Sequence, residues 1–145
     1  MSIQQMAVIE AKSALDEDPD AVYLDVRTEM EFSEGHPEGA INIPVAFSGS
    51  GGMQVNSDFT EVVEEVLSRD QSIFCGCESG VRSQMAAEIL EQAGYFSLVN
   101  VSGGYGGKTE GETVVEPGWL DQGLPVEKDV NSDNSYAALK EKAGL

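Results

Sequence analysis

The chain of 145 residues has the length of one domain and is large enough for a single substantial core. Its 26 acidic and 8 basic side chains give a formal net charge of -18, which repels phosphate backbones and anionic lipids and argues against nucleic acid or a membrane as partner. No apolar run reaches the ~20 residues that span a bilayer, and neither a secretory signal nor an extracellular disulfide framework is recognisable, so a cytoplasmic location is expected.

Strand and helix patterns alternate along the chain. In chain order we predict a helix over 8–18, a strand over 21–26, a short helix over 28–35, a strand over 40–44, a loop over 47–56, a helix over 57–70, a strand over 71–75, a helix that begins at 82 or 83 and ends before Gly94, and a strand over 97–101. Thr28, with Glu31 in the capping-box position, and Ser57 are the expected N-caps.

Alternation of strands and helices predicts an α/β fold with a central, mostly parallel sheet flanked by helices on both faces. In such sheets ligands bind beyond the carboxyl ends of the strands. The domain is expected to span residues 1–128. Residues 129–145 form a C-terminal tail with a possible short helix around Tyr136–Lys140, which either packs on the domain or frays.

The stretch "FCGCESGVRSQMAAEIL" (74–90) places two cysteines between a predicted strand and a predicted helix. Cys75 lies inside the strand, where a buried and inert side chain is expected. Cys77 lies just past the strand, in a tight turn where Gly80 can adopt a left-handed backbone conformation. The amides of such a turn and the helix N-terminus form a nest that stabilises a thiolate. We therefore predict a reactive thiol at Cys77.

Two motifs in matching order and spacing resemble those of rhodanese-like domains. The segment "YLDVRTEMEFSEGHPEGAINIP" (23–44) resembles the amino-terminal signature of the family, and "IFCGCESGVRSQMAAEILEQAGY" (73–95) resembles its active-site strand, loop and helix. "GLPVE" (123–127) resembles the closing segment, so the resemblance covers roughly residues 7–128. It implies a rhodanese-like fold.

The resemblance also implies a sulfurtransferase that moves a sulfane sulfur from thiosulfate or a related small anionic donor to cyanide or a thiol, including a protein acceptor. Cys77 corresponds to the nucleophile whose persulfide the loop amides hold, and Arg82 to a residue that counters the anionic donor or leaving group. No cofactor and no metal are implied. The expected substrate-binding residues are Glu78, Ser79, Gly80, Val81, Arg82 and Ser83.

Three further residues of the signature are expected to support the site. Arg27 is expected to pair with a nearby carboxylate such as Glu31, and Asp25 to hydrogen-bond amides of the loop beneath the site. His36, the single histidine, is expected to hold the turn of "EGHPEG", with a catalytic Cys–His pair as the alternative.

The sequence departs from the family pattern in two places. The family commonly has a tryptophan a few residues after its "GG" pair, whereas here "YGGKTEGETVVEPG" separates Gly104 from Trp119, an insertion of roughly ten residues. The segment 105–118 is expected to emerge on the active-site side, as a lid or donor-specific loop or as a surface excursion. The second departure is Cys75, for which a redox role is the minor alternative because a disulfide to Cys77 is strained.

Two other functional classes fit part of the pattern. A cysteine-dependent phosphatase or arsenate reductase also holds a thiolate in an amide cradle, but it places five residues between cysteine and arginine. Here only "ESGV" separates Cys77 from Arg82, a smaller cradle better matched to a sulfane sulfur. The other class is a regulatory binding module, or a carrier that delivers its persulfide to a dedicated protein. An intact Cys77 argues against the first of these and leaves the carrier open.

Overall fold

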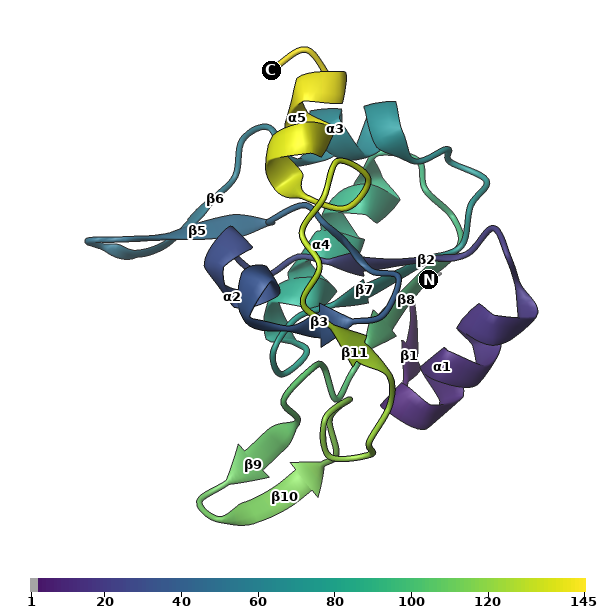
Figure 1. Ribbon diagram of the computed structural model, residues 1–145, viewed down its shortest axis with the longest axis vertical. Helices are drawn as coiled ribbons and strands as arrows, with labels where there is room; N and C mark the ends of the chain where they lie inside the picture. Colours follow the sequence, from purple (N-terminus) through teal and green to yellow (C-terminus); the bar gives the residue numbers. More distant parts are fainter. Residues whose placement is uncertain (1–2) are drawn as a thin grey trace.

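The computed structural model describes residues 3–145 and has at its centre a five-stranded sheet in the order β1-β8-β7-β2-β4 (Figure 1). Its strands are β1 (Ile3–Met6), β2 (Val22–Asp25), β4 (Ile41–Asn42), β7 (Ile73–Gly76) and β8 (Leu98–Val101). Every neighbouring pair in this sheet is parallel. The predicted α/β fold with a parallel central sheet is confirmed.

In the described part of the chain, five helices pack around the sheet: α1 (Val8–Glu17), α2 (Glu29–Glu34), α3 (Phe59–Val66), α4 (Val81–Gln92) and α5 (Tyr136–Lys142). Because side chains alternate between the faces of a strand, Leu24 and Ile73 pack with α3 and α4, whereas Tyr23 and Phe74 pack with α1 and α2. Helices therefore cover both faces, and the two resulting clusters of buried side chains form the hydrophobic core.

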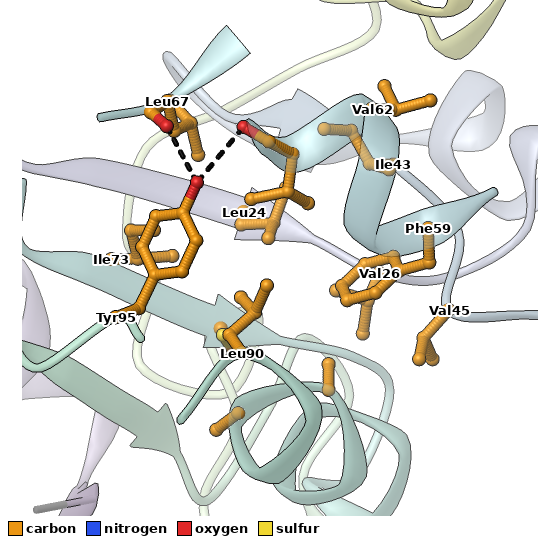
Figure 2. Close-up of a cluster of buried hydrophobic side chains, with 14 of the residues drawn as sticks. Leu24, Val26, Ile43, Val45, Phe59, Val62, Leu67, Ile73, Leu90 and Tyr95 are labelled. Carbon is orange, nitrogen blue, oxygen red and sulfur yellow. Dashed lines mark hydrogen bonds between the residues drawn. The ribbon is translucent and has the colours of Figure 1, made fainter. Parts of the chain in front are cut away.

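The larger cluster lies between the sheet and the helices α3, α4 and α5 (Figure 2). Tyr95 is buried in it, and its hydroxyl donates to the carbonyl oxygens of Leu67 at 2.7 Å and Val63 at 3.3 Å. These hydrogen bonds provide partners for the buried hydroxyl group of Tyr95, and they connect the end of α3 to the turn after α4. Cys77 belongs to the same cluster, so the core that stabilises the fold also fixes the backbone of the candidate site.

Residues 3–145 also form three two-stranded antiparallel ribbons outside the central sheet. The region 47–56, predicted as a loop, is instead the hairpin β5 (Ala46–Gly49) and β6 (Gly52–Val55). The insertion at 105–118 contains a second hairpin, β9 (Lys108–Glu110) and β10 (Thr113–Glu116). The third ribbon pairs β3 (His36–Pro37) with β11 (Val126–Glu127). Of these two strands, β11 lies in the segment that resembles the closing motif of the family.

The ends of the helices follow the sequence in part: α3 ends at Val66, four residues before the predicted end, and α4 begins at Val81, one residue before the predicted start. The predicted capping box is present, since the Thr28 side chain accepts from the amide of Glu31 and the Glu31 carboxylate accepts from the amide of Thr28. The prediction of Ser57 as cap is wrong, because α3 begins after Asp58. Asn56 instead accepts the Asp58 amide at 3.0 Å. Gly80 precedes α4 with a φ of 96°, the left-handed conformation predicted for it.

The C-terminal segment packs against the domain. Tyr136 and Leu139 of α5 are buried in the larger cluster, and Asn56 donates to the Tyr136 hydroxyl at 3.0 Å. Ser135 caps the helix by accepting the amide of Ala138. The tail that the sequence left undecided is thus held by the core, while a domain boundary at residue 128 stays a prediction. Within residues 3–145, the helices are too short or too polar to span a membrane.

Candidate active site

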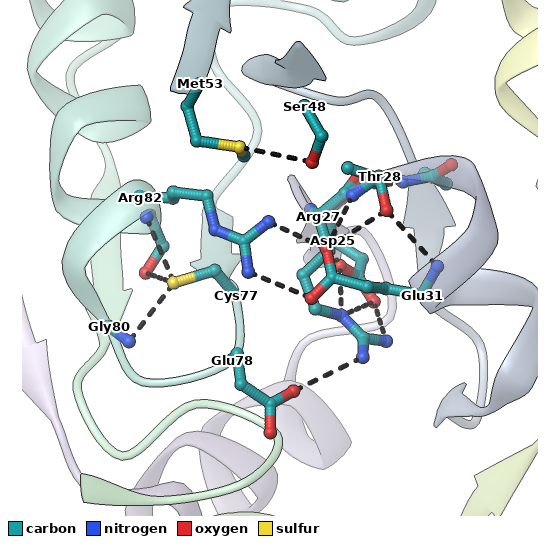
Figure 3. Close-up of polar contacts among 12 residues, drawn as sticks. Asp25, Arg27, Thr28, Glu31, Ser48, Met53, Cys77, Glu78, Gly80 and Arg82 are labelled. Carbon is teal, nitrogen blue, oxygen red and sulfur yellow. Dashed lines mark hydrogen bonds and ion pairs between the residues drawn. The ribbon is translucent and has the colours of Figure 1, made fainter. Parts of the chain in front are cut away.

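Cys77 lies at the carboxyl end of β7, directly before the loop that leads into α4 (Figure 3). Its Sγ accepts the amide hydrogens of Gly80 at 3.1 Å and Ser83 at 3.3 Å, and the Ser83 hydroxyl lies 3.3 Å away. The residue is only 1% exposed. The chain therefore curls around one sulfur atom and directs dipoles towards it, an arrangement that favours a sulfur-centred anion.

A polar network from the neighbouring strand supports this loop. The Ser83 hydroxyl donates to Oδ1 of Asn100 at 2.6 Å, and Nδ2 of Asn100 donates to the Gln5 side chain at 2.9 Å and to the Gly80 carbonyl at 3.3 Å. Asn100 belongs to β8 and is 3% exposed. Sequence reasoning missed Asn100 and Gln5, because only the pairing of β7 with β8 and of β8 with β1 brings them to the loop.

The segment that follows β8, at the start of the insertion, contacts the active-site loop through backbone hydrogen bonds. The amide of Tyr105 donates to the Cys77 carbonyl at 2.8 Å, and the amide of Gly106 donates to the Glu78 carbonyl at 2.9 Å. A Cβ on Gly104, which has a φ of 65°, would lie 2.5 Å from the Glu78 carbonyl oxygen and 2.7 Å from the Cys77 carbonyl oxygen, so a glycine is needed there for the two segments to approach. The active-site loop is therefore fixed by the base of the insertion as well as by α4.

Arg82 forms an ion pair with Glu31, with Nη1–Oε1 and Nη2–Oε2 distances of 2.8 and 3.0 Å (Figure 3). A pocket of about 480 Å³ opens over this pair, between α2 and the β5–β6 hairpin that carries Ser48 and Met53. Arg27 pairs with a nearby carboxylate, as predicted, but with that of Asp25 and not with the suggested Glu31, which pairs with Arg82. The positive charge expected to meet an anionic donor is already balanced by a carboxylate.

Arg27 and Asp25 form a buried ion pair beneath the loop. The guanidinium donates to both carboxylate oxygens of Asp25, through Nε at 2.9 Å and Nη2 at 2.7 Å, and to the Gly35 carbonyl at 2.8 Å. Asp25 also accepts, at 3.1 Å, the amide of Arg27, which lies in the connection between β2 and α2. Arg27 further stacks on the Tyr105 ring at 4.5 Å, and Glu78 approaches it at 3.6 Å. The pair thus joins α2, the loop and the insertion.

His36 is fully buried and makes contacts away from the candidate nucleophile. Its ring stacks on Phe32 with centroids 3.6 Å apart, and Nδ1 lies 2.7 Å from the Phe32 carbonyl. Nε2 lies 3.5 Å from the Glu127 carboxylate. Within residues 3–145 no hydrogen bond joins His36 to Cys77. These contacts favour the structural role predicted for His36 over a Cys–His pair.

Cys75 lies inside β7 and is fully buried. Burial, and secondarily the nearby Cys77, raise the pKa of the Cys75 thiol to about 12. Both sulfurs are free. Because the thiolate is the reactive form of cysteine and Cys75 stays protonated near neutral pH, the Cys75 thiol is unreactive there.

The ion pair between Glu31 and Arg82 gives a testable dependence of stability on pH. Burial opposes ionisation of Glu31, but hydrogen bonds from Arg82 and Thr28 outweigh it and lower the pKa of Glu31 from 4.5 to about 2. The stabilisation is therefore present above about pH 4.5 and is lost as the pH falls towards 2. We expect Glu31→Gln to cost about 1 kcal/mol or less at pH 7, since the pair is partly exposed.

Urea unfolding of wild type and Glu31→Gln at pH 7 and near pH 3 measures this effect. Glutamine retains an acceptor for the capping box, so the comparison isolates the charge. The difference between the two proteins should narrow at the lower pH. A difference that stays constant with pH would show that the carboxylate charge contributes nothing.

The geometry defines a class: a parallel α/β protein with a buried thiol at a strand end, held by the amides of the following loop. Comparison with known proteins gives the family. The family model described as "Rhodanese-like domain" matches residues 8–108. The chain belongs to the family of rhodanese-like domains.

Two relatives from Arabidopsis thaliana are named for sulfur transfer. "Thiosulfate sulfurtransferase 16, chloroplastic" is 41% identical over 103 residues, covering 71% of this chain and 77% of the relative. "Thiosulfate sulfurtransferase 18" is 39% identical over 106 residues, which cover 72% of this chain and 70% of that relative. Two other plant relatives are longer, and the aligned region spans 52% and 51% of their length. Since the names of two of these four relatives refer to the chloroplast, the cytoplasmic location stays a prediction.

Among solved structures, the crystal structure of Rv0390 from M. tuberculosis has a TM-score of 0.74 and 28% sequence identity. The match covers 87% of this chain and 98% of that chain. The rhodanese-like fold predicted from the sequence is therefore confirmed.

Proposed function

We propose that this protein is a sulfurtransferase that moves a sulfane sulfur from thiosulfate or a related anionic donor to a thiophilic acceptor through a persulfide on Cys77. One observation carries the proposal: the Sγ of Cys77 lies in a loop whose Gly80 and Ser83 amides donate to it at 3.1 and 3.3 Å. The names of two relatives, both thiosulfate sulfurtransferases, support the same reaction.

The reaction has two balanced steps. In the first, the Cys77 thiolate attacks the outer sulfur of thiosulfate, a sulfur–sulfur bond forms as the donor's own breaks, and sulfite leaves with the electron pair. In the second, cyanide or a thiolate attacks the outer sulfur of the persulfide, which releases the sulfurated acceptor and regenerates the Cys77 thiolate. A terminal persulfide sulfur carries the negative charge in the intermediate, and the loop amides stabilise it in the same way as the thiolate.

The cradle also bears on the phosphatase alternative. A cysteine-dependent phosphatase places five residues between its cysteine and its arginine, whereas four separate Cys77 from Arg82 here and Arg82 is paired with Glu31. These contacts favour sulfur transfer over phosphate ester hydrolysis.

Intact mass spectrometry tests the proposal. Wild-type protein treated with thiosulfate should gain about 32 mass units, the mass of one sulfur. Cyanide should remove this mass and yield thiocyanate. Protein that gains no mass with any sulfane-sulfur donor would show that the proposal is wrong. Protein that gains the mass but releases it only to another protein would be a carrier, with the same persulfide and a dedicated acceptor.

A further inference from the structure

The insertion hairpin β9–β10 projects from the domain (Figure 1), and the base of the insertion is hydrogen-bonded to the active-site loop. Tyr105 and Gly106 donate to the carbonyls of Cys77 and Glu78, as described above. At the other end of the insertion, Trp119 donates to the Gly104 carbonyl at 2.8 Å and Leu120 to the Tyr105 carbonyl at 3.1 Å. Both ends of the insertion are therefore held at its base, and Lys108 follows two residues after Gly106.

A pocket of about 460 Å³ lies between the hairpin and the active-site loop. Ser79 and Val81 line it from the loop, and Lys108, Glu110 and Val115 line it from the hairpin. Lys108 also lines a second pocket, of about 440 Å³, with Gly80 and Asn100 of the cradle and its support. Lys108 thus reaches both pockets that flank this side of the loop.

Lys108 differs from the arginines of the site in its partners. Arg27 is paired with Asp25 and Arg82 with Glu31, whereas Lys108 makes no ion pair within residues 3–145. Glu116, its cross-strand neighbour, is engaged by the Ser102 hydroxyl. The Lys108 ammonium therefore lines both pockets without an ion-pair partner in the described chain, and it can contact the carboxylate of a bound donor.

The chemistry of the first pocket indicates the kind of donor. Val81 and Val115 are 72% and 56% exposed, so the pocket presents apolar walls that a carbon stem can cover. The lining of this pocket also contains one positively charged side chain, Lys108, and one negatively charged side chain, Glu110. Thiosulfate is small, carries only negative charge and has no apolar part. A persulfide built on an α-amino acid or a short peptide has a carbon stem, a carboxylate and an ammonium group.

Building on the proposed function, we propose that the β9–β10 hairpin binds the sulfur donor and that Lys108 selects organic persulfides of amino-acid or short-peptide type through their carboxylate. The Cys77 thiolate attacks the outer sulfur of such a donor, the donor's sulfur–sulfur bond breaks, and the donor thiolate leaves and takes up a proton. Lys108 contacts the carboxylate away from the reacting sulfurs, so it is a specificity-determining residue.

Donor kinetics with glutathione persulfide and thiosulfate test this inference. Lys108→Gln should lower kcat/KM for glutathione persulfide about fivefold, mainly through KM, because one ion pair at a partly exposed site is lost. Its kcat/KM for thiosulfate should stay within about twofold of wild type, and Lys108→Arg should retain activity with both donors. The matched control is Lys128→Gln, which removes the same charge from an exposed position with no ion pair in the described chain.

The outcomes separate this inference from the proposed function. If Lys108→Gln behaves like Lys128→Gln with glutathione persulfide, or loses activity equally with both donors, the assignment of Lys108 as a donor-selecting residue is overturned. If wild-type protein forms a persulfide with neither donor, the proposed function itself fails. Selective loss with glutathione persulfide, with thiosulfate unaffected, supports both.

Discussion

Replacing Cys77 by serine is expected to abolish persulfide formation and to lower sulfur transfer by at least about a thousandfold. A serine hydroxyl is a poor nucleophile at neutral pH and cannot carry a sulfane sulfur as a persulfide. The two side chains are close in size, and the Gly80 and Ser83 amides that donate to Sγ can donate to a hydroxyl oxygen. We therefore expect the variant to remain folded, which circular dichroism and urea unfolding can verify.

Cys75→Ser is the matched control, because it makes the same chemical change two residues away. Cys75 is fully buried and the pKa of its thiol is about 12, so it should not take part in sulfur transfer near neutral pH. This variant should keep most of the persulfide signal, although a hydroxyl in an apolar strand costs roughly 1–3 kcal/mol of stability. If both folded variants lose the signal equally, the two cysteines act as a unit and the assignment to Cys77 alone is wrong.

The parts of the fold that the sequence predicts are those determined by local chemistry. The pairing of Thr28 with Glu31 is a contact within one helical turn, and the left-handed Gly80 follows from a tight strand-to-helix connection. The position of Cys77 follows from the end of an apolar strand. Each of these features depends on a few neighbouring residues and can be recognised without knowledge of the sheet order.

The parts that the sequence did not predict depend on contacts between distant segments. Glu31 is four residues from Arg27 in the chain, yet it pairs with Arg82, which is 51 residues away, because Asp25 takes the Arg27 guanidinium. Asn100 reaches Ser83 only through the order of the parallel strands. The partner of a charged or polar side chain is set by strand order and register, which local patterns do not contain.

Short strands with polar residues form the second group of missed features. β1 has the sequence IQQM, with two central glutamines, and it is a strand because it pairs with β8 at the edge of the sheet. The 47–56 and 105–118 segments contain many glycines and were expected as irregular structure, yet both contain hairpins. Backbone pairing in these ribbons supplies the order that their side-chain patterns do not indicate.

Gly80→Ala is expected to impair both stability and sulfur transfer. Gly80 has a φ of 96°, which costs a residue with a Cβ about 1–2 kcal/mol. A Cβ at this position would also lie 2.4 Å from the carbonyl oxygen of Ser102. That carbonyl cannot readily move, because the Ser102 amide is bonded to Met6 of β1 at 2.9 Å. The loop must shift instead, and we expect a total loss of roughly 3 kcal/mol.

The same shift should reduce the rate, because the Gly80 amide is one of the two that donate to the Cys77 sulfur. Loss of one such donor lowers the rate of related reactions by about 100-fold or more, and we expect persulfide formation to slow by a similar factor. The control is Gly111→Ala: Gly111, between β9 and β10, has a φ of 62° and nothing within 4 Å of an added Cβ. It carries the backbone strain without the collision, so it should lose about 1 kcal/mol and keep its rate with thiosulfate. Urea unfolding and the rate of mass gain measure both variants, and equal behaviour of the two would mean that the contact with Ser102 does not hold the loop.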